Sequence, residues 1–115
     1  MRRYFPLLIV AAALVCAGCG GSAQVSLEQL AEAQQTYAGR RVLTRGIVRH
    51  ERDPDGSDYF VLSDARGRIV GLEPAASARR YEGRRVQVTG LFEIQPGFGR
   101  VIHIAAIAPA SGAGG

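Results

Sequence analysis

The sequence has little of the side-chain chemistry on which disulfides and metal centres depend. Its 115 residues include two cysteines, Cys16 and Cys19, and both stand near the N-terminus. The rest of the chain therefore has no thiol for a disulfide or a thiolate metal site. The two histidines, His50 and His103, are far apart in the sequence, and neither has a cysteine beside it. We expect no metal site and no cofactor, because zinc centres draw their ligands from such clusters.

Catalytic motifs are missing as well. The sequence has no glycine-rich phosphate loop, no nucleophile elbow and no paired-acid motif. Ser57, Ser63 and Ser77 occupy predicted turns or a helix start, where serine hydroxyls bond to the backbone. We therefore predict that the chain has no catalytic residue and that the protein is not an enzyme.

Lysine and tryptophan are absent, so all 14 basic residues are arginine and the formal net charge is +4. Arg2 and Arg3 lie in the N-terminal segment considered next, and without them the charge is 4 − 2 = +2. So small a basic excess supplies little drive from counterion release. We therefore do not expect nucleic acid as the partner.

The first residues are organised like an export signal. Arg2 and Arg3 precede an apolar run over residues 5–15, which is shorter than a membrane-spanning helix. Small residues then surround Cys19. A basic start, an apolar middle and a small-residue cleavage point are typical of a secretory signal peptide, which we assign to residues 1–18.

The segment Ala17-Gly18-Cys19 resembles the lipobox of bacterial lipoproteins. The resemblance implies that Cys19 is lipidated and anchors the mature chain to a membrane, with residues 19–25 as a spacer. Gly20 stands where lipoproteins retained at the inner membrane often have aspartate, which implies the outer membrane, facing the periplasm. The alternative is an ordinary signal peptide with Cys19 as a spare thiol.

A ten-residue pattern occurs twice in the chain. Residues 37–46 read Tyr-Ala-Gly-Arg-Arg-Val-Leu-Thr-Arg-Gly, and residues 81–90 read Tyr-Glu-Gly-Arg-Arg-Val-Gln-Val-Thr-Gly. Each copy predicts a turn at its first glycine and then a strand with Gly46 or Gly90 in its middle. Such glycines permit the bend or bulge that a small barrel needs.

The hydrophobic pattern predicts the remaining elements. Ser26 and Gln29 are spaced as a capping box at the start of a helix that ends at Gly39. Apolar alternation and turn signals predict five strands. The strands are residues 42–49, 59–62, 68–72, 85–94 and 101–108, with a short helix over residues 75–82. We expect residues 109–115 to form a disordered tail.

This order of elements resembles the OB-fold over residues 37–108. Bacterial OB domains of the nucleic-acid-binding and anticodon-binding type have similar Gly-Arg-Arg-Val-x-x-x-Gly segments at their first and fourth strands. The resemblance implies a mainly β domain over residues 26–108, built as a five-stranded Greek-key barrel with an N-terminal helix and a short helix between strands three and four. An open meander sheet is the alternative.

OB-folds bind ligands across strands two and three, between the loops that follow strands one and four. The resemblance therefore implies a binding face with aromatic residues for stacking and arginines for anionic groups. The candidate ligand-binding residues are Arg45, Arg49, Tyr59, Arg68, Phe98 and Arg100. An acidic loop within residues 51–58 would repel a phosphate backbone at this face.

These observations favour a non-catalytic, lipid-anchored envelope protein whose barrel binds a protein or an envelope polymer. Single-stranded nucleic acid, an oligosaccharide or a small ligand on the strand two–three face is the alternative. A carrier similar to the periplasmic haem chaperone is a third hypothesis, which requires His103 as the attachment residue. Loose Ca²⁺ binding at the acidic loop by Asp53, Asp55 and Asp58 is a separate hypothesis, although the loop lacks the ligand pattern of an EF-hand.

Overall fold

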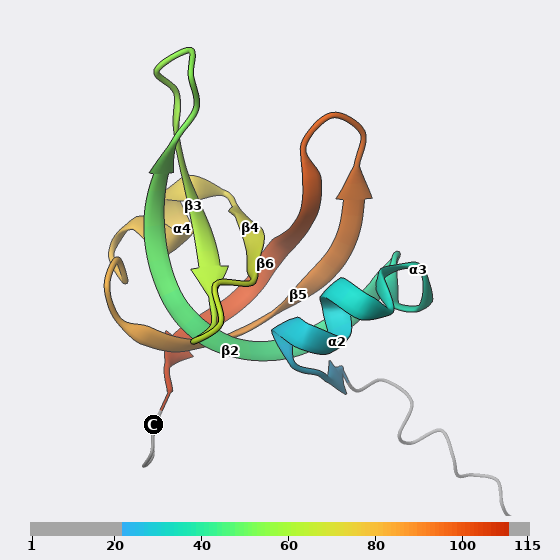
Figure 1. The fold of residues 1–115 in the computed structure, drawn as a ribbon. Helices are drawn as coiled ribbons and strands as arrows, with labels where there is room; N and C mark the ends of the chain where they lie inside the picture. The colour runs from blue at the N-terminus through green and yellow to red at the C-terminus, as the bar shows by residue number, and fades with distance from the viewer. Residues whose placement is uncertain (1–21, 111–115) are drawn as a thin grey trace, which may run out of the picture.

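A computed structural model describes residues 22–110 of the chain. The predicted signal peptide and Cys19 lie outside this range, as do residues 111–115 of the predicted tail. The described chain is mainly β, with one six-stranded sheet and three short helices (Figure 1). The strands are β1 (Ala23–Gln24), β2 (Arg40–Arg52), β3 (Asp58–Ser63), β4 (Ile69–Glu73), β5 (Arg85–Gln95) and β6 (Gly99–Pro109). The helices are α2 (Leu27–Glu32), α3 (Gln34–Tyr37) and α4 (Ala75–Arg79).

The strand order is β1-β2-β3-β4-β6-β5, and β5 also pairs with β2. The pairs β1–β2 and β4–β6 are parallel, and the others are antiparallel. All five predicted strands are present. The sixth, β1, was not predicted: it lies within the predicted spacer and pairs with β2 at Val42 and Leu43. Val25, which follows β1, is buried.

The two copies of the repeat lie side by side on β2 and β5. Thr44 and Val88 occupy equivalent positions in the two copies, and they face each other across the antiparallel pair. Gly46 lies opposite Val86, and Gly90 lies opposite Val42. An antiparallel pair whose equivalent residues meet at its centre has a local two-fold symmetry, so each copy provides the other with the same neighbours.

The same symmetry extends to the turns that begin each copy. The Gly39 N–H donates to the Phe92 carbonyl at 2.7 Å, and the Gly83 N–H donates to the Val48 carbonyl at 2.7 Å. Both glycines have a positive φ, +83° and +82° respectively. Residues with side chains rarely adopt this conformation, which explains why the pattern has glycine at its third position.

The hydrophobic core is built from one face of each strand. Along β2, Val42, Thr44 and Val48 are buried, whereas Arg45 and Arg49, which each follow a buried residue, are exposed, as the two-residue periodicity predicts. The largest fully buried side chains of the core cluster are Phe92, Leu30, Leu62 and Ile102. Burying each such side chain contributes about 1.5–3 kcal/mol, and the described chain has no cysteine to add a disulfide.

The predicted single helix is wrong in its extent. Ser26 and Gln29 do form the capping box, since Ser26 Oγ accepts from the Gln29 N–H and Gln29 Oε1 accepts from the Ser26 N–H. The helix then ends at Glu32, because Ala33 has φ −123° and ψ 40°. A separate turn, α3, follows and contacts both β2 and β5. These contacts set the direction of α3 independently of α2, which helical spacing alone does not reveal.

Several boundaries also differ from the predictions. β2 and β3 extend further than predicted, because the hairpin closes tightly where the Asp53 N–H donates to the Ser57 carbonyl at 2.8 Å. α4 ends at Arg79, three residues before the predicted end at residue 82. β6 continues to Pro109, the first residue of the predicted tail, because it pairs with Val86 of β5.

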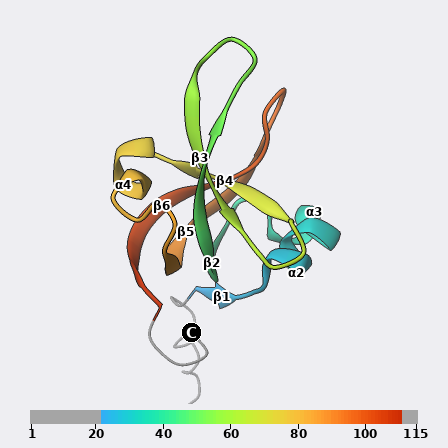
Figure 2. The ribbon, with the colours of Figure 1, turned by 60° about the vertical axis from the view of Figure 1, so that its left-hand side comes forward.

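Different hairpins and turns lie at the two ends of the molecule. The β2–β3 and β5–β6 hairpins project at one end in both views, which we call the hairpin end (Figures 1 and 2). β1, the turn between β3 and β4 and the last residues of β6 lie at the opposite end, which we call the base (Figures 1 and 2). α4 contacts β3, β4 and β6, whereas α2 and α3 contact β2.

Candidate binding groove between two hairpins

A groove of about 380 Å³ opens at the hairpin end, and we call it the hairpin groove. Its walls come from the β2–β3 hairpin on one side and the β5–β6 turn on the other, and its floor comes from β3 and β4. The lining residues are Asp53, Tyr59, Val61, Ile69, Gly71, Gly97, Phe98, Gly99 and Arg100. The volume is within the range of small-ligand pockets.

The floor of the groove depends on a glycine. Val61 on β3 lies opposite Gly71 on β4, and Gly71 lies opposite Val101 on β6. The ring of Phe98 rests on Gly71, where a Cβ atom would stand 2.7 Å from the ring atom Cε2. Any side chain at position 71 would therefore force the Phe98 ring to move from this position.

Two aromatic rings join the hairpins across the groove. Tyr59 of β3 and Phe98 of the β5–β6 turn meet edge to face, with ring centroids 5.7 Å apart and an interplanar angle of 74°. Such a pair contributes about 0.5–1.5 kcal/mol beyond the area it buries. Phe98 nevertheless remains 44% exposed, so one large apolar surface is presented to a ligand.

Arg100 supplies a fixed positive charge at the groove. Its Nη2 donates to the Ile69 carbonyl at 3.2 Å, and its Nη1 lies 3.5 Å from Gln34 Oε1 on α3. Within residues 22–110, no salt bridge engages this guanidinium. The two contacts hold the planar group in place and leave its charge available to a carboxylate or another anion.

The opposite wall is acidic. Asp58 Oδ1 lies 3.0 Å from His50 Nε2 and accepts from Arg52 Nε at 3.1 Å. The His50 hydrogen bond, with a further contribution from Arg52, holds the pKa of Asp58 below its ordinary value. Asp55 accepts from the Ser57 N–H at 2.9 Å, and this bond lowers the pKa of Asp55. Both carboxylates are therefore negative at neutral pH.

These contacts bear on the calcium hypothesis. Asp55 and Asp58 use their oxygens within the hairpin, one in the turn and one in the pairs with His50 and Arg52. Over the part of the chain that the structure describes, no three acidic, histidine or cysteine residues gather in a way that suits a metal ion. Two of the three carboxylates in the calcium hypothesis, Asp55 and Asp58, therefore already have partners within the hairpin.

The structure divides the six predicted ligand-binding residues between two places. Tyr59, Phe98 and Arg100 line the hairpin groove. Arg49 is exposed on β2 opposite Val61, so it lies beside the groove. The last two, Arg45 and Arg68, line a different hollow at the base.

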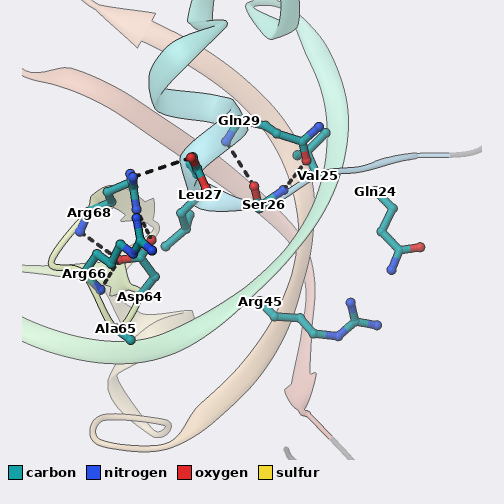
Figure 3. Close-up of a pocket in the computed structure, with 11 residues that line it drawn as sticks. Gln24, Val25, Ser26, Leu27, Gln29, Arg45, Asp64, Ala65, Arg66 and Arg68 are labelled. Atoms are coloured by element: carbon teal, nitrogen blue, oxygen red, sulfur yellow. Dashed lines mark hydrogen bonds and ion pairs between the residues drawn. The ribbon is translucent and has the colours of Figure 1, made fainter.

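The base hollow has a volume of about 550 Å³ and lies between the start of α2 and the β3–β4 turn (Figure 3). Arg68 is held there by Asp64, at 3.4 Å, and by Glu28, at 3.7 Å. Burial disfavours the charged form of Asp64, but hydrogen bonds from the Arg68 and Arg66 backbone and the Arg68 guanidinium lower its pKa overall. Arg45 extends on the Gln24 side of the hollow, away from the Asp64–Arg68 pair (Figure 3).

Sequence reasoning missed the apolar part of the groove. Val61, Ile69 and Gly71 become neighbours only through the pairing of β3 with β4, which no local pattern specifies. One signal was available, since Phe98 stands between two glycines in a predicted turn. A large apolar residue at such a position has no covering neighbours in its own segment, which favours a contact with another part of the molecule.

Both histidines are paired with carboxylates. His103 Nε2 lies 2.9 Å from Glu93 Oε1, and its Nδ1 lies 3.6 Å from Glu73 Oε1. His50 stacks on Phe60 with ring centroids 5.1 Å apart, in addition to its contact with Asp58. The haem hypothesis would require His103 to give up at least one of these two contacts.

Comparisons with known proteins add no family assignment. No protein-family model and no curated protein sequence matches the chain. Among residues 22–110, no helix has the length and apolar character needed to cross a membrane.

Proposed function

We propose that the five long strands form an OB-fold barrel. Three features support this interpretation. The order β2-β3-β4-β6-β5 is joined at its ends by the β5–β2 pairing, β4 and β6 are parallel, and α4 connects β4 to β5. An experimental test is the nuclear Overhauser effect between backbone protons of Thr44 and Val88. Its absence in the folded protein would favour the open meander sheet.

We further propose that the protein is a non-catalytic binding module of the cell envelope, and that the hairpin groove receives a segment of a partner protein. The observation that carries this proposal is the exposed Phe98 beside Tyr59 and the fixed Arg100. Aromatic residues and arginine are enriched in the centres of protein interfaces, where they provide most of the binding energy.

The charges around the groove narrow the chemistry of the partner. Asp53 lines the groove, and Asp55 and Asp58 stand on the same hairpin with lowered pKa values. A negative hairpin attracts a basic segment and repels phosphate groups. We therefore propose a partner segment that combines an apolar side chain, which covers Phe98, with basic residues that face the acidic hairpin and a carboxylate that pairs with Arg100.

Photo-crosslinking in intact cells tests the groove. A photoreactive phenylalanine analogue at position 98 is expected to give a crosslinked protein, whereas the same analogue at Ala76, exposed on α4, is expected to give none. Asp53→Asn together with Asp55→Asn should reduce the crosslinked product several-fold, because it removes the attraction for a basic segment. Equal products from positions 98 and 76 would contradict the proposal.

The alternative ligands are tested by direct titration. Short single-stranded DNA and envelope oligosaccharides are added to the labelled protein while the amide signals of Tyr59, Phe98 and Arg100 are followed by NMR. We expect no saturable shift from DNA, because the acidic hairpin opposes its backbone. A saturable shift from either ligand that Phe98→Ala removes, without any protein crosslink at position 98, would favour that ligand.

The anchor is the last part of the proposal. The lipobox-like segment at Cys19 supports lipidation, and Gly20 supports the outer membrane with the domain in the periplasm. Mass spectrometry of the mature N-terminal peptide should show acyl groups on Cys19. Cys19→Ser should move the protein from the membrane fraction to the soluble fraction. An unmodified thiol at Cys19 would overturn the anchor and leave the groove untouched.

A further inference from the structure

We propose that the base of the domain rests on anionic lipid headgroups through an arginine face made of Arg45, Arg66 and Arg85. The inference depends on the proposed anchor at Cys19 and adds an orientation to it. The base faces the bilayer, and the hairpin groove faces away from it toward a partner.

The chain between the lipid anchor and the folded domain is short, which keeps the base near the membrane. Gly20 and Gly21 alone separate Cys19 from Ser22, the first described residue. Because an extended chain spans at most about 3.6 Å per residue, the Cα atoms of Cys19 and Ser22 are at most about 11 Å apart. β1 begins at the next residue and is hydrogen-bonded to β2. A lipid on Cys19 therefore holds the base close to the membrane surface.

The surface that the anchor holds near the membrane is positively charged. Gln24 of β1 lines the same hollow as Arg45 and Arg66 (Figure 3). Arg85 lies opposite Ile47 on the strand next to Arg45, whose guanidinium bonds to Gln87 at 2.9 Å. All three arginines are exposed, and none takes part in a salt bridge among the described residues.

The acidic residues of the base cancel only part of this charge. Asp64 and Glu28 are both engaged by Arg68, so these three groups together are −1, and with the three face arginines the six groups have a net charge of +2. Ile47, in register with Arg85, is also 36% exposed and adds apolar contact area.

The opposite end of the molecule reinforces the orientation. The acidic hairpin, with Asp53, Asp55 and Asp58, projects at the hairpin end, away from β1 (Figures 1 and 2). An anionic bilayer therefore attracts one end and repels the other. Because the attraction decays within a Debye length of about 10 Å in moderate salt, the short tether is required to keep the arginine face within range.

The size of the effect follows from the number of arginines. Each arginine near an anionic surface favours the docked orientation by about fivefold, so three arginines favour it by about 100-fold. The triple variant of the arginine face, with Arg45→Gln, Arg66→Gln and Arg85→Gln, should therefore lose most of the docking. A matched control, Arg40→Gln with Arg79→Gln and Arg80→Gln, removes the same charge from exposed positions outside the face that take part in no salt bridge among the described residues.

The test uses the mature lipoprotein purified from membranes, after mass spectrometry has verified its acyl groups. It is reconstituted in phosphatidylcholine vesicles with or without about 30% phosphatidylglycerol. Hydrogen exchange is then measured at residues 23–24 and 65–67 of the base and at residues 53–57 of the hairpin. We expect slower exchange at the base only with phosphatidylglycerol, and loss of that protection in about 1 M salt.

The outcomes separate the two proposals. Protection of the base that persists in the control triple variant and disappears in the face variant supports the inference. Acylated protein with no phosphatidylglycerol-dependent protection, or with protection at the hairpin, overturns the inference and leaves the anchor intact. Protein without acyl groups overturns both. Protection lost equally in the two triple variants would show that total charge, not this face, is responsible.

Discussion

The two copies of the repeat, residues 37–46 and 81–90, share six residues and the same glycine conformation at their first glycine, but they differ in what surrounds them. Their first glycines make matching hydrogen bonds of 2.7 Å, and their centres face each other at Thr44 and Val88. Local sequence therefore reproduces local geometry. The neighbours of each copy come from strands elsewhere in the chain, and they need not be equivalent.

The second glycines show the difference most clearly. A Cβ atom at Gly46 would stand 2.8 Å from the Ser63 carbonyl and 2.9 Å from the side chain of Leu62 on β3. A Cβ atom at Gly90 would collide with the backbone of His103 on β6, next to a register shift between Thr89 and Gly90. The same pattern position thus meets a backbone carbonyl and a movable side chain in one copy, and a closer backbone beside a bulge in the other.

The centres differ in polarity. Thr44 and Val88 are both buried, but Thr44 Oγ1 has no hydrogen-bond partner among the described residues. A buried hydroxyl without a partner costs about 1–3 kcal/mol. The first copy therefore has a destabilising group where the second has a methyl.

The largest expected difference in stability between the two copies is at their second glycines, Gly46 and Gly90. Gly90→Ala should lower the free energy of unfolding by about 3 kcal/mol, and Gly46→Ala by about half as much, because the new Cβ meets the His103 backbone more closely than the Ser63 carbonyl, and the Leu62 side chain at Gly46 can move. Urea denaturation of the two variants measures this difference. An equal loss in both, or a larger loss at Gly46, would contradict the assignment of the bulge to the second copy.

The next largest effect is expected at the centre of the repeat pair, where Thr44→Val would place the same side chain in both copies. Thr44→Val should raise the free energy of unfolding by about 1 kcal/mol, because it replaces an unpaired hydroxyl with a methyl of similar shape. Val88→Thr, its mirror change, should lower it by about 2 kcal/mol. Both are measured by urea denaturation. A loss of stability in Thr44→Val would mean that the hydroxyl has a partner in solution.

A smaller effect tests the part that the copies share. Gly39→Ala and Gly83→Ala should each cost about 1 kcal/mol, since the strain of a positive φ applies equally and no atom lies within 4 Å of either new Cβ. Asparagine at either position should cost less than alanine, because it tolerates this conformation better. Unequal losses would show that the two turns differ in solution.

The smallest effect concerns the hairpin that continues from the first copy. The pKa of Asp58 is lowered by its contact with His50, so the charged form is stabilised in the folded state. This contribution is present above the unfolded pKa and is lost as pH falls through the lower folded pKa. His50→Ala should return the pKa of Asp58 toward its ordinary value in a carboxyl NMR titration. An unchanged titration would assign the shift to Arg52 alone.

Much of the fold was predictable from the sequence because its signals are local. The capping box of Ser26 and Gln29, the alternating face of β2 and the glycine turns at Gly39 and Gly83 depend on residues a few positions apart. The strand β1 was not predictable, because Ala23 and Gln24 have no strand pattern of their own. They become a strand only because the neighbouring part of β2 has a free edge.

The candidate groove was predictable only in part. Tyr59, Phe98 and Arg100 were expected at one face and do line one groove. Arg45 and Arg68 were expected with them, but the strongly bent β2 and the β3–β4 turn place them at the base. Alternation along a strand specifies the face of a side chain, and the curvature of the sheet then decides which residues of one face stay together.

The sequence by itself determined which residues point inward, where the chain turns and that two segments repeat, because periodicity and glycine conformations act over a few residues. Tertiary structure alone decided that the repeats pair about a shared centre, that Phe98 lies on Gly71, and that Arg45 and Arg66 line the base hollow whereas Phe98 and Arg100 line the hairpin groove. Those outcomes depend on pairing between strands tens of residues apart, and the free energy of such pairing is spread over the whole core.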